Sequence, residues 1–188
     1  GVARVMREEG KPCAAGLLMA RELEFLGALL QNPARPFVAI LGGVKVSDKI
    51  GVLHNLLEKV DTLLIGGAMS YAFTKAQGHE VGTSYFKEED APIAAEIIEE
   101  AKSSRAAFHL PQDFLVADRD AEDAQTQFVA ADAIPADKMG MDIGPQTRAE
   151  YSAIIESAQT VLWNGPMGRF EVSLFAEGTR AVAEAVAK

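Results

Sequence analysis

The sequence predicts an α/β fold, namely a Rossmann-like, three-layer structure in which a parallel sheet carries helices on both faces. Two observations lead to this prediction. Short apolar runs alternate with helical patterns along the 188 residues, as in chains built from βαβ units. Two consecutive apolar runs also end in glycine pairs, at 42–43 and 66–67. The carboxyl ends of parallel strands are where open α/β sheets bind ligands.

The first part of the chain has a helical pattern. Residues 1–30 are expected to form a leading helical segment, and the apolar positions between Leu17 and Leu30 give it a broad apolar face. Prolines at 33 and 36 then mark a loop. Phe37 to Leu41 is a continuous apolar run of the kind found in buried strands.

The remaining elements follow in alternation. After the first glycine pair we expect a helix over 47–59, capped by Ser47 or Asp48. Residues 139–145 hold two glycines and a proline, so they are expected to form a shaped loop. The other expected strands are 61–65, 106–110, 114–117, 126–130 and 160–163, and the other expected helices are 68–77, 88–103, 145–157 and 172–188, the last interrupted near Gly178.

Composition narrows the class of protein. A net charge of −9 makes non-specific nucleic-acid binding a poor fit. The single cysteine, Cys13, excludes an internal disulfide and a cysteine-rich metal site, and it suits the reducing cytoplasm. No apolar run approaches the ~18 residues of a membrane span. The acidic run 118–123 lacks the spacing of a calcium loop, so a solvated loop is the favoured interpretation.

The stretch 37–49 combines the parts of a phosphate site. A buried strand leads into Gly42-Gly43, and a helix start carrying Lys49 follows, with Lys45 four residues before it. Free N–H groups at a helix start attract anions, and a lysine adds a point charge. The pattern matches neither the P-loop nor the dinucleotide fingerprint. Taken alone, a glycine pair after a strand is more often only a tight turn.

Six stretches occur in a fixed order, namely residues 15–19 with 22–23, 37–50, 64–69, 139–145, 163–171 and 175–179. Together they resemble the C-terminal, nucleotide-binding lobe of the phosphoglycerate kinase family. The resemblance extends along essentially all of 1–188, and it implies that residues 1–30 are a leading, hinge-side segment. It implies a phosphotransferase of glycolysis that converts ATP and 3-phosphoglycerate reversibly to ADP and 1,3-bisphosphoglycerate, with Mg²⁺ accompanying the nucleotide.

The resemblance also implies roles for individual residues. Lys45 would be catalytic and stabilise the transferring phosphoryl group, and Lys49 would hold nucleotide phosphate. Asn164 would contact phosphate as a neutral donor, and Glu171 would accept hydrogen bonds from the ribose hydroxyls. The expected lining of the adenine slot is Gly42, Gly43, Gly66, Gly67, Gly140 and Pro166. For Gly67 and Gly140, a purely structural role in shaping the backbone remains the alternative.

Three positions depart from the family pattern. Val44 stands where the family commonly has Ala, and Ala68 where it commonly has Gly, so both add bulk near the proposed slot. Arg169 replaces an apolar residue. It either pairs with Glu171, in competition with ribose, or points to solvent.

The resemblance further implies parts that this chain lacks. We expect it to be truncated at both ends, without the N-terminal lobe that binds 3-phosphoglycerate and without the Mg²⁺-linked aspartate. No metal site is therefore expected within the chain. The isolated fragment is expected to be inactive and to bind nucleotide weakly at best. The full-length protein is expected to be a monomer.

Two other hypotheses stay open. The chain is alternatively a folded, inactive module that associates through its open sheet edge, without a working nucleotide site. A Rossmann domain for NAD or a nucleotide sugar ranks last, because the glycine fingerprint and its acidic partner are missing.

Overall fold

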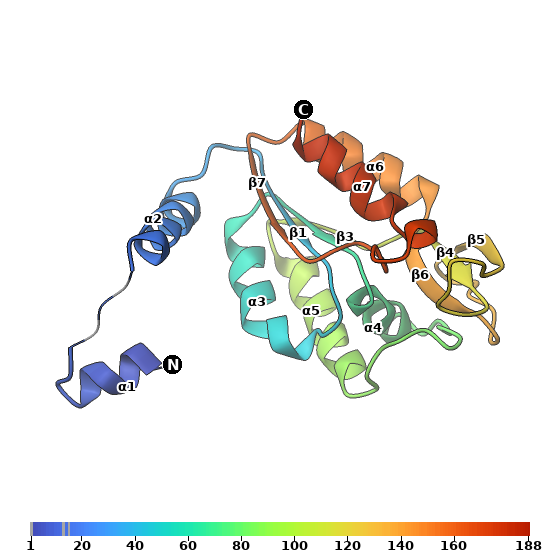
Figure 1. Ribbon diagram of the computed structural model, residues 1–188, viewed down its shortest axis with the longest axis horizontal. Helices are drawn as coiled ribbons and strands as arrows, with labels where there is room; N and C mark the ends of the chain where they lie inside the picture. The colour runs from blue at the N-terminus through green and yellow to red at the C-terminus, as the bar shows by residue number, and fades with distance from the viewer. Residues whose placement is uncertain (1, 13, 15) are drawn as a thin grey trace. The chain divides into compact units, whose positions relative to one another are not determined.

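The structure is a computed structural model that describes residues 2–12, 14 and 16–188. The chain divides into two compact units, residues 1–33 and 34–188. The first unit contains α1 (Val2–Glu8) and α2 (Leu17–Gln31) (Figure 1). Its helical character agrees with the expectation for residues 1–30. The large apolar side chains that are described at the start of α2, from Leu17 to Leu23, are exposed.

The second unit is built on a parallel sheet of four strands. Their order is β3 (Ala107–His109), β2 (Thr62–Ile65), β1 (Phe37–Leu41) and β7 (Thr160–Asn164). Every residue of β1 is buried, as expected for a central strand flanked on both sides.

Helices cover both faces of this sheet. Figure 1 shows α3 (Ile50–Lys59) and α5 (Asp90–Ser103) on one side, and α6 (Pro145–Glu156) and α7 (Glu177–Val186) on the other. The short helix α4 (Met69–Ala76) follows β2 directly. This arrangement confirms the predicted fold class, with strands and helices within two residues of most expected boundaries.

A second, antiparallel sheet was not expected from the sequence. It consists of β5 (Thr126–Ala130), β4 (Asp113–Ala117) and β6 (Met139–Ile143). The prediction of a loop over 139–145 was therefore wrong for its first five residues. Gly140 suggested a break in regular structure. In the fold it lies within β6, where the Tyr71 side chain packs against the strand, and an added Cβ would lie 2.3 Å from the Tyr71 hydroxyl.

Two helix starts also differ from expectation. A short 3₁₀ helix, η1 (Ser47–Lys49), precedes α3. Near the C-terminus a second one, η2 (Ser173–Phe175), precedes α7, so Gly178 lies in the first turn of α7 and does not interrupt a longer helix.

One buried cluster lies between the parallel sheet and the α6–α7 layer, where Val38, Ile40 and Tyr151 pack together. Trp163 is only half-buried against this cluster, and its indole N–H donates to the Gly165 carbonyl at 2.7 Å. None of the described helices is long and apolar enough to cross a bilayer.

Candidate functional site

The carboxyl ends of three strands are joined by backbone hydrogen bonds. Gly42, just after β1, donates to the carbonyl of Asn164 at the end of β7 (2.9 Å). Gly66, just after β2, donates to the carbonyl of Leu41 (2.8 Å). The two glycine pairs predicted from the sequence therefore lie side by side at this edge of the sheet.

The loop after β7 joins the same network. Gly43 donates to the Pro166 carbonyl and Gly67 to the Met167 carbonyl, both at 3.0 Å. The turns after β1, β2 and β7 thus form one continuous backbone surface.

Glycine is required at these turns. Gly67 has φ +65°, and a Cβ there would lie 2.5 Å from the Gly43 nitrogen. At Gly42 a Cβ would lie 2.0 Å from the Pro166 carbonyl oxygen. Any side chain at either position would separate the turns.

A cavity of about 580 Å³ opens beside these turns. Its volume falls in the range of small-molecule sites. Five of the predicted site residues line it, namely Gly43, Gly67, Gly140, Pro166 and Glu171. The rest of its lining is Val44, Ala68, Tyr71, Thr83, Ser84, Tyr85, Phe86, Asp120, Met139, Met141, Gly168 and Arg169. Gly42 and Gly66 do not line the cavity but are buried within the turns that form its wall.

The two lysines and Asn164 lie outside the cavity lining. The Lys49 ammonium donates to the Gly42 carbonyl at 2.5 Å, and burial lowers the pKa of this lysine. A Cβ added at Gly43 would lie 3.4 Å from the same ammonium, so the cation is adjacent to the cavity wall. Lys45 is exposed on the loop after the glycine pair, and Asn164 is exposed at the last position of β7.

The lysine-bearing turn is held by a residue that the sequence did not indicate. The carboxylate of Asp90, which is 1% exposed, accepts hydrogen bonds from the backbone N–H groups of Ser47 (3.1 Å) and Val46 (3.4 Å). The prediction of a cap by Ser47 was wrong, because the N-cap positions are Val46 for η1 and Lys49 for α3, and neither makes a side-chain cap. The side chain of Asp48, the other predicted cap, lies outside the described part of the structure. Asp90 could not be identified from the sequence, because it is far from Ser47 along the chain and no local pattern links the two positions.

The three departures from the family pattern all line the cavity. Val44 and Ala68 lie in its wall, where their side chains are larger than the residues that the family commonly has there. Of the two alternatives for Arg169, the structure shows the ion pair, with Nη1 3.1 Å from Oε2 of Glu171. Its Nε also donates to Oδ2 of Asp120 at 3.0 Å.

A buried carboxylate lies close to the cavity. Asp142, on β6, accepts hydrogen bonds from the N–H groups of Gly178 (2.6 Å) and Ile143 (2.9 Å). It is 1% exposed, and burial raises its pKa to about 7. A Cβ at Gly168, which lines the cavity, would lie 2.4 Å from Asp142 Oδ1. The cavity rim, β6 and the start of α7 are therefore packed as one body.

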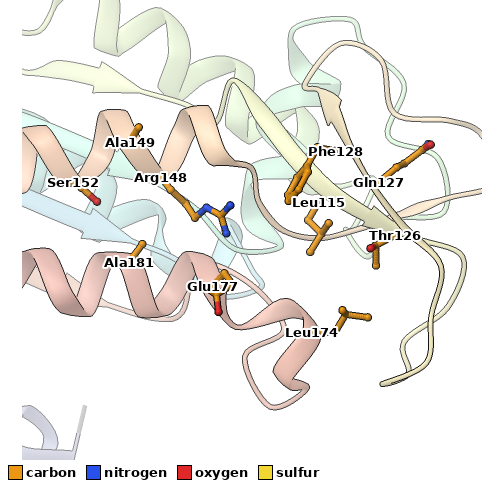
Figure 2. A pocket seen from close by; sticks show the side chains of 10 residues that line it. All are labelled: Leu115, Thr126, Gln127, Phe128, Arg148, Ala149, Ser152, Leu174, Glu177 and Ala181. Carbon is orange, nitrogen blue, oxygen red and sulfur yellow. The ribbon is translucent and has the colours of Figure 1, made fainter.

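A second cavity of similar size, about 570 Å³, contains none of the predicted site residues. Figure 2 shows Arg148 on α6 and Glu177 on α7 facing the same hollow, with Phe128 and Leu115 of the second sheet at one end. The Arg148 guanidinium lies 5.7 Å from the centre of the Phe128 ring.

The acidic run 118–123 forms a closed loop. Arg119 pairs with Asp118 (2.7 Å) and with Asp123 (3.1 Å), and Asp118 accepts the backbone N–H of Gln125 at 2.8 Å. Within the described part of the chain, no three His, Cys, Asp or Glu side chains are grouped so as to hold a metal ion.

These features define the class of protein: a Rossmann-like α/β domain with a glycine-walled cleft at the carboxyl edge of its parallel sheet. The sequence model of phosphoglycerate kinase matches residues 1–188, and the chain belongs to the phosphoglycerate kinase family.

Two solved structures agree with this assignment. Phosphoglycerate kinase from Coxiella burnetii is 43% identical, with a TM-score of 0.88 over 92% of this chain. Phosphoglycerate kinase from Pyrococcus horikoshii OT3 is 30% identical, with a TM-score of 0.78 over 95% of this chain. In both comparisons the match covers 45% of the solved chain, so this chain spans less than half the length of either relative.

Proposed function

We propose that this chain supplies the nucleotide-binding half of a cytoplasmic, glycolytic phosphoglycerate kinase. The reaction is the reversible transfer of a phosphoryl group from ATP to 3-phosphoglycerate, which gives ADP and 1,3-bisphosphoglycerate. One observation carries the proposal: Gly43, Gly67, Gly140, Pro166 and Glu171, from four separate stretches, meet around a single cavity of about 580 Å³.

The cavity suits a flat, largely apolar ring. Its glycines present backbone without side chains, so a base can lie directly against the turns. Tyr71 and Phe86 add aromatic and apolar surface. Small-ligand sites combine such surface with a few polar groups that fix orientation.

In this proposal the polar groups around the cavity bind the sugar and the phosphates of the nucleotide. Glu171 would accept hydrogen bonds from ribose hydroxyls at the rim. Lys49 would exchange the Gly42 carbonyl for a phosphate oxygen, and Lys45 would stabilise the transferring phosphoryl group. Asn164 would add a neutral donor. Phosphoryl transfer depends mainly on positioning and on charge neutralisation, which lysines supply.

Mg²⁺ would enter this site as part of the nucleotide. The family implies a magnesium nucleotide, whose metal neutralises phosphate charge. Among the described residues no carboxylate cluster could hold the ion. Mg²⁺ is commonly bound through substrate phosphates and only one or two carboxylates. No step of the reaction is therefore assigned to a metal ligand of this chain.

The polypeptide 1–188 is expected to be inactive by itself. Catalysis requires 3-phosphoglycerate to be held opposite the nucleotide, and closure around both substrates. The leading segment, residues 1–30, is proposed as the hinge-side segment. A coupled assay on the purified chain should show no turnover, and measurable turnover would contradict this expectation.

Nucleotide binding can be tested directly by titrating MgADP into the labelled protein and following amide NMR shifts. We expect weak, saturable binding, with shifts concentrated at 42–43, 66–67, 140 and 171. Lys49→Met should weaken it. Lys102→Met is the matched control, because Lys102 pairs with Glu99 on α5 and does not line the cavity. Shifts confined to the second cavity, or no saturable shift, would overturn the proposal.

The alternative function is an association-prone structural module. One observation favours it: β7 ends the sheet, with β1 as its only described partner strand. Unpaired strand edges promote association. Light scattering that shows a mass rising with concentration, together with no response to MgADP, would support the module over a working site.

A further inference from the structure

Three charged side chains form a connected group at the mouth of the cavity. Arg169 donates from Nε to Oδ2 of Asp120 (3.0 Å), and its Nη1 lies 3.1 Å from Oε2 of Glu171. All three residues line the cavity. We call them the rim cluster. One guanidinium is thus shared by two carboxylates that come from different loops.

The Asp120 side of the rim cluster is fixed in place. Its loop is closed by the Asp118–Gln125 hydrogen bond. The same loop is attached to the segment after Glu171, because Glu122 accepts hydrogen bonds from the backbone N–H and the hydroxyl of Ser173, both at 3.2 Å.

Arg169 is fixed at its backbone as well, since its N–H donates to the Met141 carbonyl at 2.8 Å. The backbone of Arg169 is therefore held at the rim, and Asp120 still binds the guanidinium when Glu171 leaves. Glu171 is the more exposed carboxylate, with 53% of its side chain accessible against 42% for Asp120. Exposed ion pairs are weak. The Glu171 contact can therefore be exchanged for another hydrogen-bonding partner.

We propose that Arg169 is a specificity-determining residue that sets how strongly this site selects ribose over deoxyribose. The inference rests on the proposed nucleotide function. When a ribonucleotide enters, Glu171 exchanges the Arg169 guanidinium for the two ribose hydroxyls, and Asp120 retains the guanidinium. A 2′-deoxynucleotide offers one hydroxyl fewer, so it replaces the ion pair less completely.

Competition for one cation gives two substitutions with opposite effects. In Arg169→Gln, Glu171 has no guanidinium to exchange. Its hydrogen bonds to both ribose hydroxyls then contribute fully to binding, so selection for ribose should rise. In Asp120→Asn, Arg169 loses its second partner and binds Glu171 more strongly, so selection for ribose should fall. Both positions are exposed, and neither change removes a buried group.

The measured quantity is the ratio of the dissociation constants of 2′-deoxy-ADP and ADP, from NMR titrations of the whole chain. Both ligands carry the same phosphates, so the ratio cancels the general effect of charge on anion binding. We expect Arg169→Gln to raise the ratio and Asp120→Asn to lower it, each by about two- to fivefold, as suits a partly exposed pair. Arg180→Gln is the control, because Arg180 pairs with Glu177 on α7, away from the cavity.

The possible outcomes distinguish the role of Arg169 from the nucleotide function. If ADP binds in the cleft but both variants keep the wild-type ratio, the role of Arg169 is wrong and the nucleotide function stands. The role of Arg169 is also wrong if Arg180→Gln changes the ratio as much as Arg169→Gln does. If neither nucleotide binds in the cleft of the wild-type chain, the proposed function is overturned and the role of Arg169 with it.

Discussion

The carboxylate of Asp90, at the start of α5, accepts a hydrogen bond from the backbone N–H of Ser47 at 3.1 Å. It also accepts the N–H of Val46, so one buried side chain fixes the turn between Lys45 and Lys49. We predict that Asp90→Ala lowers the free energy of unfolding by about 1–3 kcal/mol, because buried donors lose their acceptor. Urea unfolding measures this loss.

The Asp90 prediction has an isosteric control. Asp90→Asn keeps one acceptor oxygen, so it should lose less stability than Asp90→Ala. The amides of residues 46 and 47 should exchange faster with solvent in the alanine variant. Equal stability of the alanine variant and the wild type would show that the turn does not depend on this carboxylate.

Gly67 and Gly51 provide a matched pair of glycine substitutions. Gly67→Ala forces a Cβ against the Gly43 nitrogen at a positive φ. Strain and overlap together should cost roughly 2–5 kcal/mol. Gly51 is exposed in α3, and apart from its chain neighbours and its own helix backbone no atom lies within 4 Å of an added Cβ, so Gly51→Ala should stabilise by up to about 1 kcal/mol. Denaturant midpoints shifted in the same direction by both variants would contradict the prediction.

The strands and turns that form the cavity wall could be predicted because their signals are local. An apolar run followed by a glycine pair specifies β1 and its turn within a few residues, and the same pattern specifies β2. The resemblance to a known family supplied the rest of the candidate site, including Gly140 and Glu171.

The parts that could not be predicted depend on contacts between distant segments. Asp90 and Asp142 are acidic residues without a local motif, and only the fold brings each against backbone N–H groups. Residues 139–143 were expected to be part of a loop because the stretch 139–145 holds two glycines and a proline. In the structure the first of these glycines gives Tyr71 room beside β6.

Tyr151 joins α6 to the parallel sheet. Its buried hydroxyl donates to the Ile65 carbonyl at 2.6 Å and lies 3.2 Å from the His109 carbonyl. Tyr151→Phe should lower the free energy of unfolding by about 1–2 kcal/mol, since the Ile65 carbonyl loses this donor while the ring still fills the core. Tyr85→Phe, at an exposed position, is the control and should leave the thermal midpoint unchanged. Equal midpoints for the two variants would refute the contribution of the hydroxyl.

Asp142 should make stability depend on pH. Burial is the main reason that its pKa is about 7 in the folded chain rather than the usual 3.8. The hydrogen bonds from Gly178 and Ile143 and the charge of Arg148 lower this pKa, and the charge of Glu177 raises it. Between about pH 4 and pH 7 the folded state therefore holds a proton that the unfolded state has lost. Stability must fall as pH rises through this window, by up to about 1.4 kcal/mol for each pH unit.

Asp142→Asn isolates this effect, because asparagine does not titrate. The variant gives up one of the two acceptor oxygens, so it should be less stable than the wild type at pH 4. As pH rises to 7 the wild type loses the stability linked to its proton, so the unfolding free energy of the variant should rise relative to that of the wild type. Above pH 7 the difference between the two unfolding free energies should stay constant. Urea unfolding at a series of pH values measures it, and a difference that is constant from pH 4 to 7 would show that Asp142 is ionised throughout in the folded chain.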